Sequence, residues 1–566
     1  MDSTKDTENY IARTFAELLV KHGITRAVVS PGSRNTPLLI ALSRKPSIAT
    51  EVVVDERSAG FMALGLALVS QKPVVLICTS GSALLNYAPA VAEAYYRRIP
   101  LVVVSADRPK EWIDQDDSQT IVQPGALSNY VKRSYDLSVD RSEADRWYAN
   151  RLINDALLAT VSGRQAPVHI NIQFDNPLGR LQDSELFEPR VISMLEPEPR
   201  LSEDQLSRLS NQLASTKKVM VIAGFLPPCP QLNSALRKLA ALPNFVVLTE
   251  TISNLSGPDF VSYIDSTLAA INPSRYAEFH PDIVISLGGA LVSRHIKQFL
   301  RENKLREHWH VGVSRTTIDC FQSLTLRVEM NPSSFFPLLA DSLSSEKIVS
   351  DYATQWEVAA RRALSLRQSF ASKCEWSDFK AFSTLIPLIP KNWNVQYSNG
   401  TSIRYAQIFG DHAYHRCDCN RGVSGIDGCT STAIGSSLDY EGVTLLISGD
   451  MSAQYDIGAL ASQQISPRFK MIIMDNEGGG IFRFIPSTAN LDIRDRFHCV
   501  PGNLNWKAIA EAFGLSYFDV RDEDRLRTEF PLFRDLESSS ALMVIHTPGQ
   551  LSADILNQYF EFNKTN

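Results

Sequence analysis

Residues 443–452 read VTLLISGDMS and residues 470–476 read KMIIMDN. Each stretch is a short apolar run, as expected of a buried strand, and each leads into polar residues. Asp450 follows the first run, and Asn476 follows the second 26 positions later. That gap leaves room for one crossover helix, over 452–464, so the two runs are predicted to be parallel strands of one α/β sheet. We expect Asp450 and Asn476 at the carboxyl ends of these strands, where such sheets bind ligands.

The residues at this sheet edge indicate a metal-bridged diphosphate. Carboxylate and amide oxygens are hard donors of the kind that Mg²⁺ prefers, phosphate oxygens and water would complete its shell, and Ca²⁺ tolerates a similar set. Ser452 is predicted to cap the crossover helix, whose amino end would offer N–H groups to a phosphate. Residues 477–482, EGGGIF, let the backbone approach a ligand closely. The alternative is that Asp450 and Asn476 are ordinary turn residues at strand ends.

The same alternation of apolar runs and helical patterns recurs along the chain and predicts the α/β class. A polar stretch with several prolines, over 181–202, interrupts the alternation and is interpreted as a linker. Because 566 residues far exceed one usual core, we predict three consecutive parallel-sheet α/β domains, over 1–185, 200–345 and 375–566. Further strands are predicted at 27–29, 51–54, 74–78, 101–104, 168–172, 218–223, 245–248, 283–287, 309–313, 394–399 and 541–546.

Composition excludes several classes of function. Hydrophobic residues make up 44% and charged residues 21%, and the formal net charge is −6, without a basic block to bind nucleic acid. The glycine run is not a Rossmann GxGxxG, and a Walker A sequence is absent. Without a recognisable signal peptide or membrane span, we expect a cytoplasmic protein. The eight cysteines are expected to be thiols, and we interpret Cys417 and Cys419, with His412 and His415 nearby, as structural rather than as a zinc site.

Gly449-Asp450 and Asn476 match the fingerprint of thiamine-diphosphate-dependent enzymes, in which GD opens the motif and Asn closes it. Other segments closely resemble one branch of that family, the 2-succinyl-5-enolpyruvyl-6-hydroxy-3-cyclohexene-1-carboxylate synthases of menaquinone biosynthesis. The segments that carry this resemblance are SPGSRNTP (30–37), DERSAG (55–60), TSGSALLNYAPAVAEA (79–94), ADRP (106–109) and RGVSGIDG (421–428). They cover the first and third predicted domains strongly and the middle one weakly.

The resemblance implies a division of labour among the domains and a reaction. Residues 1–185 would bind the pyrimidine of thiamine diphosphate, 200–345 would form a central domain, and 375–566 would bind the diphosphate. In the family, two subunits share each active site, which implies a homodimer or a homotetramer. The implied reaction decarboxylates 2-oxoglutarate and adds the resulting succinyl carbanion equivalent to isochorismate.

The resemblance also assigns roles to residues around the cofactor. Glu56 matches the catalytic glutamate that hydrogen-bonds a pyrimidine nitrogen, and we expect it to be shielded from water. Ile426 matches the aliphatic residue that holds the cofactor bent. Asp450, Asn476 and the Gly478 carbonyl are implied as Mg²⁺ ligands, with Mn²⁺ as an alternative metal. The implied apolar wall beside the cofactor consists of Ile481, Phe482 and Ile485.

Both implied substrates are dicarboxylates, so their site needs guanidinium groups that bind carboxylates in a bidentate manner. The family's substrate-binding positions fall on Ser33, Arg34, Arg108, Gln119, Arg294, Arg404, Arg421 and Phe482. Two places depart from the family pattern. Arg294-His295 stands where relatives often have Lys-Arg after a Ser, and Ser398-Asn399-Gly400-Thr401 precedes Arg404, whereas relatives commonly have Gly-Asn-Ser ahead of this substrate arginine.

Two other functions stay open at this point. The chain could belong to another kind of thiamine enzyme, such as an acetohydroxyacid synthase or a 2-oxo acid decarboxylase, although the arginines favour larger anionic substrates. It could also be a catalytically silent regulatory protein that retains the cofactor. The presence of Glu56, Asp450 and Asn476 argues against silence.

Overall fold

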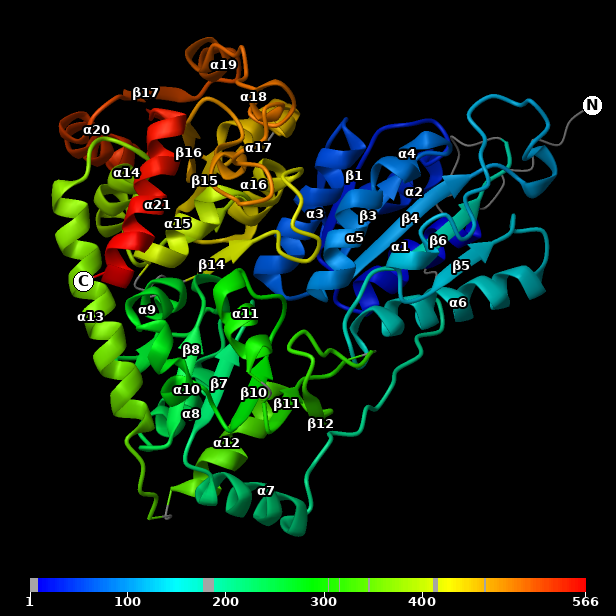
Figure 1. The fold of residues 1–566 in the computed structure, drawn as a ribbon. Helices are drawn as coiled ribbons and strands as arrows, with labels where there is room; N and C mark the ends of the chain where they lie inside the picture. Colours follow the sequence, from blue (N-terminus) through cyan, green and yellow to red (C-terminus); the bar gives the residue numbers. More distant parts are fainter. Residues whose placement is uncertain are drawn as a thin grey trace, which may run out of the picture. The chain divides into compact units, whose positions relative to one another are not determined.

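The computed structural model describes residues 9–176, 188–303, 305–314, 316–344, 347–410, 416–462 and 465–565. The chain divides into two compact units (Figure 1). Unit 1 comprises Met1–Pro197, Gly422–Glu441 and Tyr455–Ser466, and unit 2 comprises Glu198–Arg421, Gly442–Gln454 and Pro467–Asn566. Among the helices of the described ranges, none is long and apolar enough to cross a membrane.

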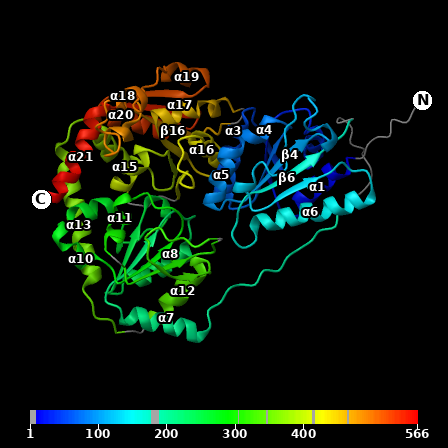
Figure 2. The same cartoon turned by 45° about the vertical axis from the view of Figure 1, so that its right-hand side comes forward.

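Unit 1 contains a six-stranded sheet in the order β2-β1-β3-β4-β6-β5, and every neighbouring pair is parallel. Helices α1, α2 and α6 form a core with one face of this sheet, and α6 runs along it in Figure 2. The strands are β1 (Arg26–Val29), β2 (Ala49–Val52), β3 (Val74–Cys78), β4 (Leu101–Asp107), β5 (Ser134–Leu137) and β6 (Val168–Gln173). The helices are α1 (Tyr10–Lys21), α2 (Thr36–Ser43), α3 (Glu56–Ser70), α4 (Ser82–Asn86), α5 (Ala88–Arg97) and α6 (Glu143–Val161).

The central sheet belongs to unit 2 and has the order β12-β11-β10-β7-β8-β9. Helices α7, α8 and α12 cover one face, and α9, α11 and α13 cover the other. Its strands are β7 (Val219–Ala223), β8 (Phe245–Thr249), β9 (Phe260–Val261), β10 (Ile283–Leu287), β11 (Glu307–Val311) and β12 (Leu324–Val328). Its helices are α7 (Glu203–Ser215), α8 (Pro230–Ala240), α9 (Ile264–Ala270), α10 (Tyr276–Phe279), α11 (Arg294–Glu302), α12 (Pro332–Leu343) and α13 (Tyr352–Lys373).

The third sheet, also in unit 2, has the order β14-β13-β15-β16-β18-β17. Helices α14, α15, α20 and α21 build a shared core against it, rich in Phe and Tyr. Its strands are β13 (Asn394–Tyr397), β14 (Arg416–Cys419), β15 (Thr444–Gly449), β16 (Phe469–Asp475), β17 (Ser516–Val520) and β18 (Ala541–His546). The helices of this part of the chain are α14 (Asp378–Leu385), α15 (Thr401–Phe409), α16 (Cys429–Asp439), α17 (Asp450–Tyr455), α18 (Arg494–Phe497), α19 (Trp506–Ala512), α20 (Glu523–Asp535) and α21 (Gly549–Thr565).

Three parallel six-stranded sheets confirm the predicted fold class. The first and third sheets have the same strand order, shifted by twelve strand numbers, whereas the order of the central sheet is different. Strands β5, β9, β12, β14 and β17 were not predicted, because they are short or polar. β14 contains Cys417 and Cys419, which are buried thiols that form no disulfide. His412 and His415, and residues 181–187 of the predicted linker, lie outside the described residues.

Candidate functional site

Asp450 and Asn476 lie at the carboxyl ends of β15 and β16, which are neighbouring parallel strands. Asp450 is 5% exposed and Asn476 is 2% exposed. The Asp450 carboxylate accepts hydrogen bonds from the backbone N–H groups of Met451 and Gly478, both at 2.7 Å. Burial raises the pKa of Asp450 to about 6. The spacing of the sequence therefore placed both side chains at one sheet edge correctly.

The crossover after Asp450 differs from its prediction. A helix was expected over 452–464 with Ser452 as its cap, but α17 begins at Asp450 and ends at Tyr455. A separate 3₁₀ turn, η6 (Ile457–Ala461), follows. Ser452 is thus a buried residue inside the first turn of α17 and does not cap it. The prediction was wrong because it took Ser452 as the capping residue on the basis of residue type. In the structure β15 ends at Gly449 and α17 begins directly at Asp450.

Asn476 binds Asp378 through its amide nitrogen. Its Nδ2 donates to Oδ2 of Asp378 at 2.7 Å, and this is its one recorded side-chain hydrogen bond among the described residues, so Oδ1 is available to a ligand. A nearly buried amide oxygen left open beside a carboxylate matches the hard donors of a Mg²⁺ site. The residues present therefore fit a divalent cation that bridges to a diphosphate.

The glycine run after Asn476 is tightly packed. Gly478 has φ of +73°, and a Cβ atom there would lie 2.3 Å from the Val500 carbonyl oxygen. Only glycine fits this position, which orients the Gly478 peptide beside Asp450. The following turn, η7 (Gly480–Arg483), carries Ile481 and Phe482, both partly buried, and the Phe482 ring lies 5.1 Å from that of His498.

Three of the predicted substrate arginines interact electrostatically in unit 2. Burial lowers the pKa of Arg404, on α15, and the neighbouring Arg294 and Arg421 lower it further. Arg421 donates to the Asn399 side-chain oxygen at 3.0 Å. The Nε atoms of Arg404 and Arg421 are buried and have no hydrogen-bond partner in the described part of the chain. Such unsatisfied guanidinium groups suit carboxylate ligands.

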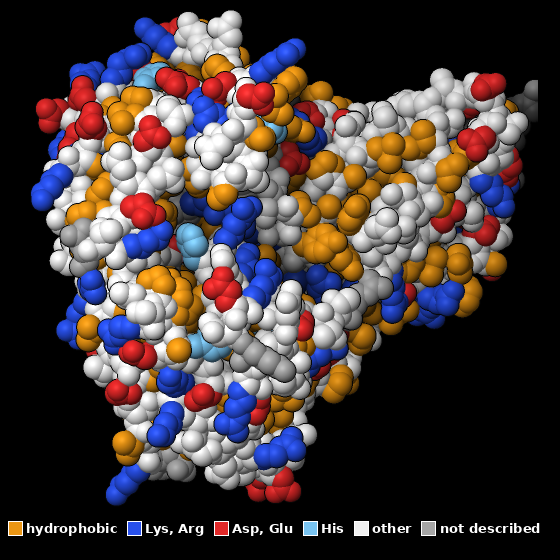
Figure 3. All heavy atoms as spheres, viewed as in Figure 1, with side chains coloured by type: hydrophobic (Ala, Val, Ile, Leu, Met, Phe, Trp, Pro, Cys, Tyr) orange, Lys and Arg blue, Asp and Glu red, His pale blue; other side chains and the backbone are white. Residues whose placement is uncertain are grey.

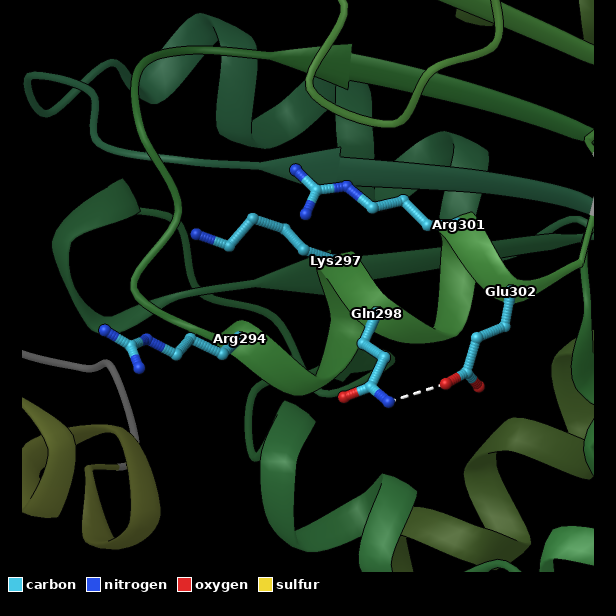
Figure 4. A pocket seen from close by; sticks show the side chains of 5 residues that line it. All are labelled: Arg294, Lys297, Gln298, Arg301 and Glu302. Carbon is cyan, nitrogen blue, oxygen red and sulfur yellow. Dashed lines mark hydrogen bonds between the residues drawn. The ribbon is translucent and has the colours of Figure 1, made fainter. Parts of the chain in front are cut away.

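Arg294 begins α11 and lines a pocket of about 550 Å³ (Figure 4). In Figure 4, Arg294, Lys297 and Arg301 extend from one side of the helix, whereas Gln298 and Glu302 lie together on another and share a hydrogen bond. Lys and Arg side chains gather over this region on the surface in Figure 3. The positive charge at this pocket therefore comes from Lys297 and Arg301 as well as from Arg294, the one residue that the sequence motif indicated.

Two buried carboxylates balance these cations. Glu250 accepts hydrogen bonds from the backbone of Val292 and Ser293, both at 2.7 Å, and burial raises its pKa to about 7. Asp265 lies 3.4 Å from His295, and the hydrogen bond between them raises the pKa of that histidine. The departure from the family pattern at His295 thus has a local counter-ion in Asp265.

Ser33, Arg34 and Gln119 belong to unit 1, where Arg34 and Gln119 lie against residues 79–81. Arg34 is 7% exposed and donates to the Phe174 carbonyl at 3.0 Å, and its backbone N–H donates to the Thr79 hydroxyl at 3.3 Å. Burial, and then the charge of Arg108, lower the pKa of Arg34. Ser33 is exposed beside it, and Gln119 lies against Gly81, where a glycine Cβ would be 3.2 Å from its Cγ.

Arg108 already has an anionic partner. Its guanidinium forms a 2.7 Å ion pair with Asp117, and its Nε is buried without a hydrogen-bond partner among the described residues. The segment that carries Asp117 has positive φ at Asp114, Asp116 and Gln119, at 59°, 54° and 60°. Such angles are uncommon in residues other than glycine, so this loop holds a defined, strained shape.

Glu56 is the first residue of α3 and is partly buried. Asp55 caps the helix by accepting from the backbone N–H groups of Arg57 and Ser58. The charge of Glu56 contributes to raising the pKa of Cys78 and Tyr87, after the larger effect of burial. The Glu56 charge therefore acts on Cys78, the last residue of β3, and on Tyr87.

Ile426 also belongs to unit 1 and is partly buried. It lies in a loop whose first residues, Gly422 and Val423, donate their N–H groups to the fully buried Glu93 carboxylate at 2.8 and 2.7 Å. The loop leads into α16, which packs against α3. A Cβ on Gly65 would lie 2.1 Å from the Thr432 carbonyl, and one on Gly435 would lie 2.1 Å from the Met62 carbonyl.

Sequence reasoning did not find the partners of these site residues. Asp378 behind Asn476 and the Glu250–Asp265 pair come from distant parts of the chain, and Asp117 opposite Arg108 lies nine positions away in a loop. Each is an acidic residue in an ordinary polar context, and only Asp378 stands near a helix-start signal, since Ser377 caps α14. No local pattern in the sequence distinguishes them from surface acids.

Comparisons with known proteins agree with this arrangement. Residues 10–126 match the model of the thiamine pyrophosphate enzyme N-terminal TPP binding domain, and residues 197–380 match that of the middle domain of thiamine pyrophosphate enzymes. A 2-succinyl-5-enolpyruvyl-6-hydroxy-3-cyclohexene-1-carboxylate synthase of Porphyromonas gingivalis is 40% identical over 557 residues, which cover 96% of each chain. Proteins of the same name are 36% identical in Flavobacterium johnsoniae, over 97% of this chain and 98% of the relative, and 36% in Bacteroides thetaiotaomicron, over 96% and 97%.

Three parallel α/β sheets, the hard-oxygen set at the ends of β15 and β16 and the two domain matches define a thiamine-diphosphate-dependent enzyme. The class contains several branches with different substrates. The full-length identity of 34–40% settles the branch: the chain belongs to the 2-succinyl-5-enolpyruvyl-6-hydroxy-3-cyclohexene-1-carboxylate synthase family.

Proposed function

We propose that the protein catalyses the thiamine-diphosphate-dependent decarboxylation of 2-oxoglutarate and joins the remaining succinyl unit to isochorismate. The products are 2-succinyl-5-enolpyruvyl-6-hydroxy-3-cyclohexene-1-carboxylate and CO₂, in menaquinone biosynthesis. The family relationship supports this reaction. The structural observation that carries the choice of substrates is the arginine cluster of unit 2, in which Arg404 interacts with Arg294 and Arg421.

Arginines separate this reaction from those of other thiamine enzymes. A small 2-oxo acid such as pyruvate carries one carboxylate, whereas both proposed substrates carry two. Buried guanidinium groups whose N–H atoms lack partners are costly unless an anion binds them. Arg404 and Arg421 each have a buried Nε without a partner among the described residues, although Arg421 also donates to Asn399. They favour dicarboxylate substrates over those of an acetohydroxyacid synthase or a simple decarboxylase.

The cofactor assignment includes one Mg²⁺ per thiamine diphosphate, with Mn²⁺ as an alternative. Asp450, Asn476 and the Gly478 carbonyl are the proposed protein ligands, and diphosphate oxygens and water would complete the shell. When bound, thiamine diphosphate supplies the electron sink that allows CO₂ to leave a 2-oxo acid. The amino end of α17 would add backbone N–H groups and a positive dipole toward the diphosphate.

Glu56 is the proposed proton-handling residue. It would share a proton with a ring nitrogen of the cofactor's pyrimidine, and its place at the start of α3 keeps it partly out of water. Ile426, Ile481 and Phe482 would form the apolar surroundings that hold the cofactor bent and exclude water. Ser33, Arg34, Arg108 and Gln119 would contact substrate.

We further propose that the enzyme is a cytoplasmic homodimer or homotetramer in which two subunits share each active site. Family resemblance motivates the shared site. The test is the oligomeric state by light scattering, combined with a mixture of two inactive variants, Glu56→Gln and Asp450→Asn. If subunits exchange and share sites, mixed dimers regain one intact site and therefore part of the activity. Independent sites would give none.

The first test of the function is product formation. Purified protein is incubated with thiamine diphosphate, Mg²⁺, 2-oxoglutarate and isochorismate, and products are identified by mass, with Glu56→Gln in parallel. We expect the succinylated product from the wild type, and a loss of at least about 100-fold for Glu56→Gln with cofactor binding retained. Glu17→Gln, a matched change at an ion pair with Lys45 in unit 1, should retain activity.

Other outcomes point elsewhere. CO₂ release from pyruvate without the succinylated product would keep the cofactor and discard the substrates. Cofactor uptake without turnover of any 2-oxo acid would favour a silent regulatory protein. Failure to bind thiamine diphosphate at all would contradict the assignment of the site at β15 and β16.

A further inference from the structure

The side chain of Asn476 can bind a metal in only one of its two orientations. An asparagine amide carries an oxygen that can coordinate a cation and an NH₂ group that cannot. The two differ by a half-turn of the amide plane, which leaves the shape of the side chain unchanged. Something near Asn476 must therefore fix which end faces the cation site.

Asp378 lies directly behind Asn476. Its Oδ2 accepts from the Asn476 Nδ2 at 2.7 Å, and both residues are at least 98% buried. Both oxygens of Asp378 accept hydrogen bonds, Oδ1 from the Thr547 hydroxyl and Oδ2 from Asn476, so Asp378 binds the NH₂ end of the amide and not its oxygen end. With its Nδ2 on Asp378, the Asn476 amide has its oxygen on the opposite side, and no side-chain hydrogen bond to that oxygen is recorded among the described residues.

Asp378 is itself held in place by two other elements. Its Oδ1 accepts from the Thr547 hydroxyl at 2.6 Å, just after β18, and its backbone N–H donates to the Ser552 hydroxyl at 2.9 Å, on α21. It stands at the first position of α14, which Ser377 caps. The carboxylate therefore cannot rotate away from Asn476 without breaking contacts to β18 and α21.

We infer that Asp378 is a positioning residue that fixes the amide of Asn476 with its oxygen toward the divalent cation. The inference rests on the proposed function, because it takes Asn476 as a metal ligand. Side chains that orient metal ligands from behind contribute about 10–100-fold to metal affinity. Nothing in the motif around Asn476 reveals Asp378, which lies 98 positions earlier in the chain.

The first experiment measures divalent cation binding without substrate. Mn²⁺ binding in the presence of thiamine diphosphate is followed by electron paramagnetic resonance, and Mg²⁺ binding by competition. Asp378→Asn keeps the size of the side chain but can offer an NH₂ group to Asn476, which then turns its own NH₂ toward the cation. We expect affinity to fall about 10–100-fold. Thr547→Val removes one of the contacts that hold Asp378 but leaves its Oδ2 opposite Asn476, so the Mn²⁺ affinity should fall less than in Asp378→Asn.

A reversed pair distinguishes orientation from simple loss of structure. Asn476→Asp alone places two carboxylates face to face, and we expect weak Mn²⁺ binding. Combined with Asp378→Asn, the new amide donates to the new carboxylate and leaves its second oxygen for the cation, so binding should recover at least about tenfold over either single variant. The melting temperatures of the metal-free proteins are measured in parallel.

The outcomes separate this inference from the proposed function. Wild-type affinity in Asp378→Asn, an equal loss in Thr547→Val, or no recovery in the reversed pair would each overturn the role of Asp378. If Asp378→Asn fails to fold, the reversed pair still decides the question. Absence of any Mn²⁺- and thiamine-diphosphate-dependent binding in the wild type would instead overturn the cofactor site itself.

Discussion

The first and third sheets have the same strand order, but the residues that directly follow equivalent strands differ in chemical type. β3 corresponds to β15, and β4 corresponds to β16. After β3 comes Thr79 and after β4 comes Arg108, whereas Asp450 follows β15 and Asn476 follows β16. One sheet edge thus carries a hydroxyl and a cation, while the other carries two hard-oxygen donors.

The comparison shows that topology places the strand ends, whereas single residues determine what can bind at them. A parallel sheet of this order brings the ends of its middle strands to one edge in both cases. The first residue after each strand then determines whether the edge attracts carboxylates or a metal. Two sheets of one topology can therefore share a task, with one binding anionic groups and the other binding a cation and a diphosphate.

The largest expected effect comes from exchanging the chemistry at equivalent strand ends. Asp450→Asn removes the only charged protein ligand of the proposed Mg²⁺ set, and we expect thiamine diphosphate affinity at fixed Mg²⁺ to fall by more than about 100-fold, measured by calorimetry. Thr79→Val, the corresponding position of the first sheet, should leave that affinity close to wild type. Equal losses in both variants would break the proposed division between the two edges.

The helices that precede β3 and β15 are also equivalent, and they meet in unit 1. Gly435→Val would place a side chain against the Met62 carbonyl. Its Cβ atom alone would lie 2.1 Å from the carbonyl oxygen. We expect a loss of at least about 2 kcal/mol in stability and a lower melting temperature. Gly458→Ala, whose added carbon would meet its nearest neighbour at 3.6 Å, is the control and should melt near wild type. A wild-type melting temperature for Gly435→Val would contradict the close approach of α3 and α16.

The arginines of unit 2 are balanced by a carboxyl that ionises near neutral pH. Burial raises the pKa of Glu250 to about 7 from 4.5. The folded protein therefore holds a proton that the unfolded chain releases, and this stabilisation is full below the unfolded pKa and lost as pH rises through 7. We expect the wild-type free energy of unfolding to decrease between about pH 5 and about pH 8 by an amount on the order of 3 kcal/mol, with a corresponding fall in the melting temperature. Glu250→Gln should give a flatter profile, and an equally steep one would rule Glu250 out as the cause.

In unit 1 the substrate arginine Arg108 is neutralised by a partly exposed ion pair with Asp117, so breaking this pair should have the smallest effect of the changes considered. Asp117 occupies Arg108 in the absence of substrate. Asp117→Asn should free the guanidinium and lower the KM for a dicarboxylate substrate by up to about fivefold, because pairs of this exposure contribute about 1 kcal/mol or less. The gain should shrink at high salt. A higher KM would show that Asp117 holds the loop rather than competing with substrate.

Periodicity and spacing in the sequence predicted the three sheets and the two strand ends at Asp450 and Asn476. The family motifs supplied Glu56 at the start of α3. Two kinds of feature stayed out of reach. Ser452 was misplaced because a helix can begin directly at a strand end without a separate capping residue. Asp378, Asp117 and Glu250 act through contacts across 98, 9 and 42 positions, respectively, and such contacts are decided by packing rather than by local pattern.

The contact between α3 and α16 limits how this chain can evolve. At Gly65 and at Gly435 the neighbouring helix backbone occupies the space where a side chain would begin. Any single replacement at either position meets main-chain atoms, which no rotamer change elsewhere can move aside. A substitution at one glycine therefore cannot be compensated by a later substitution at the other, because each new side chain adds a clash of its own. Gly65 on α3 and Gly435 on α16 are therefore two positions at which neutral substitution is not expected.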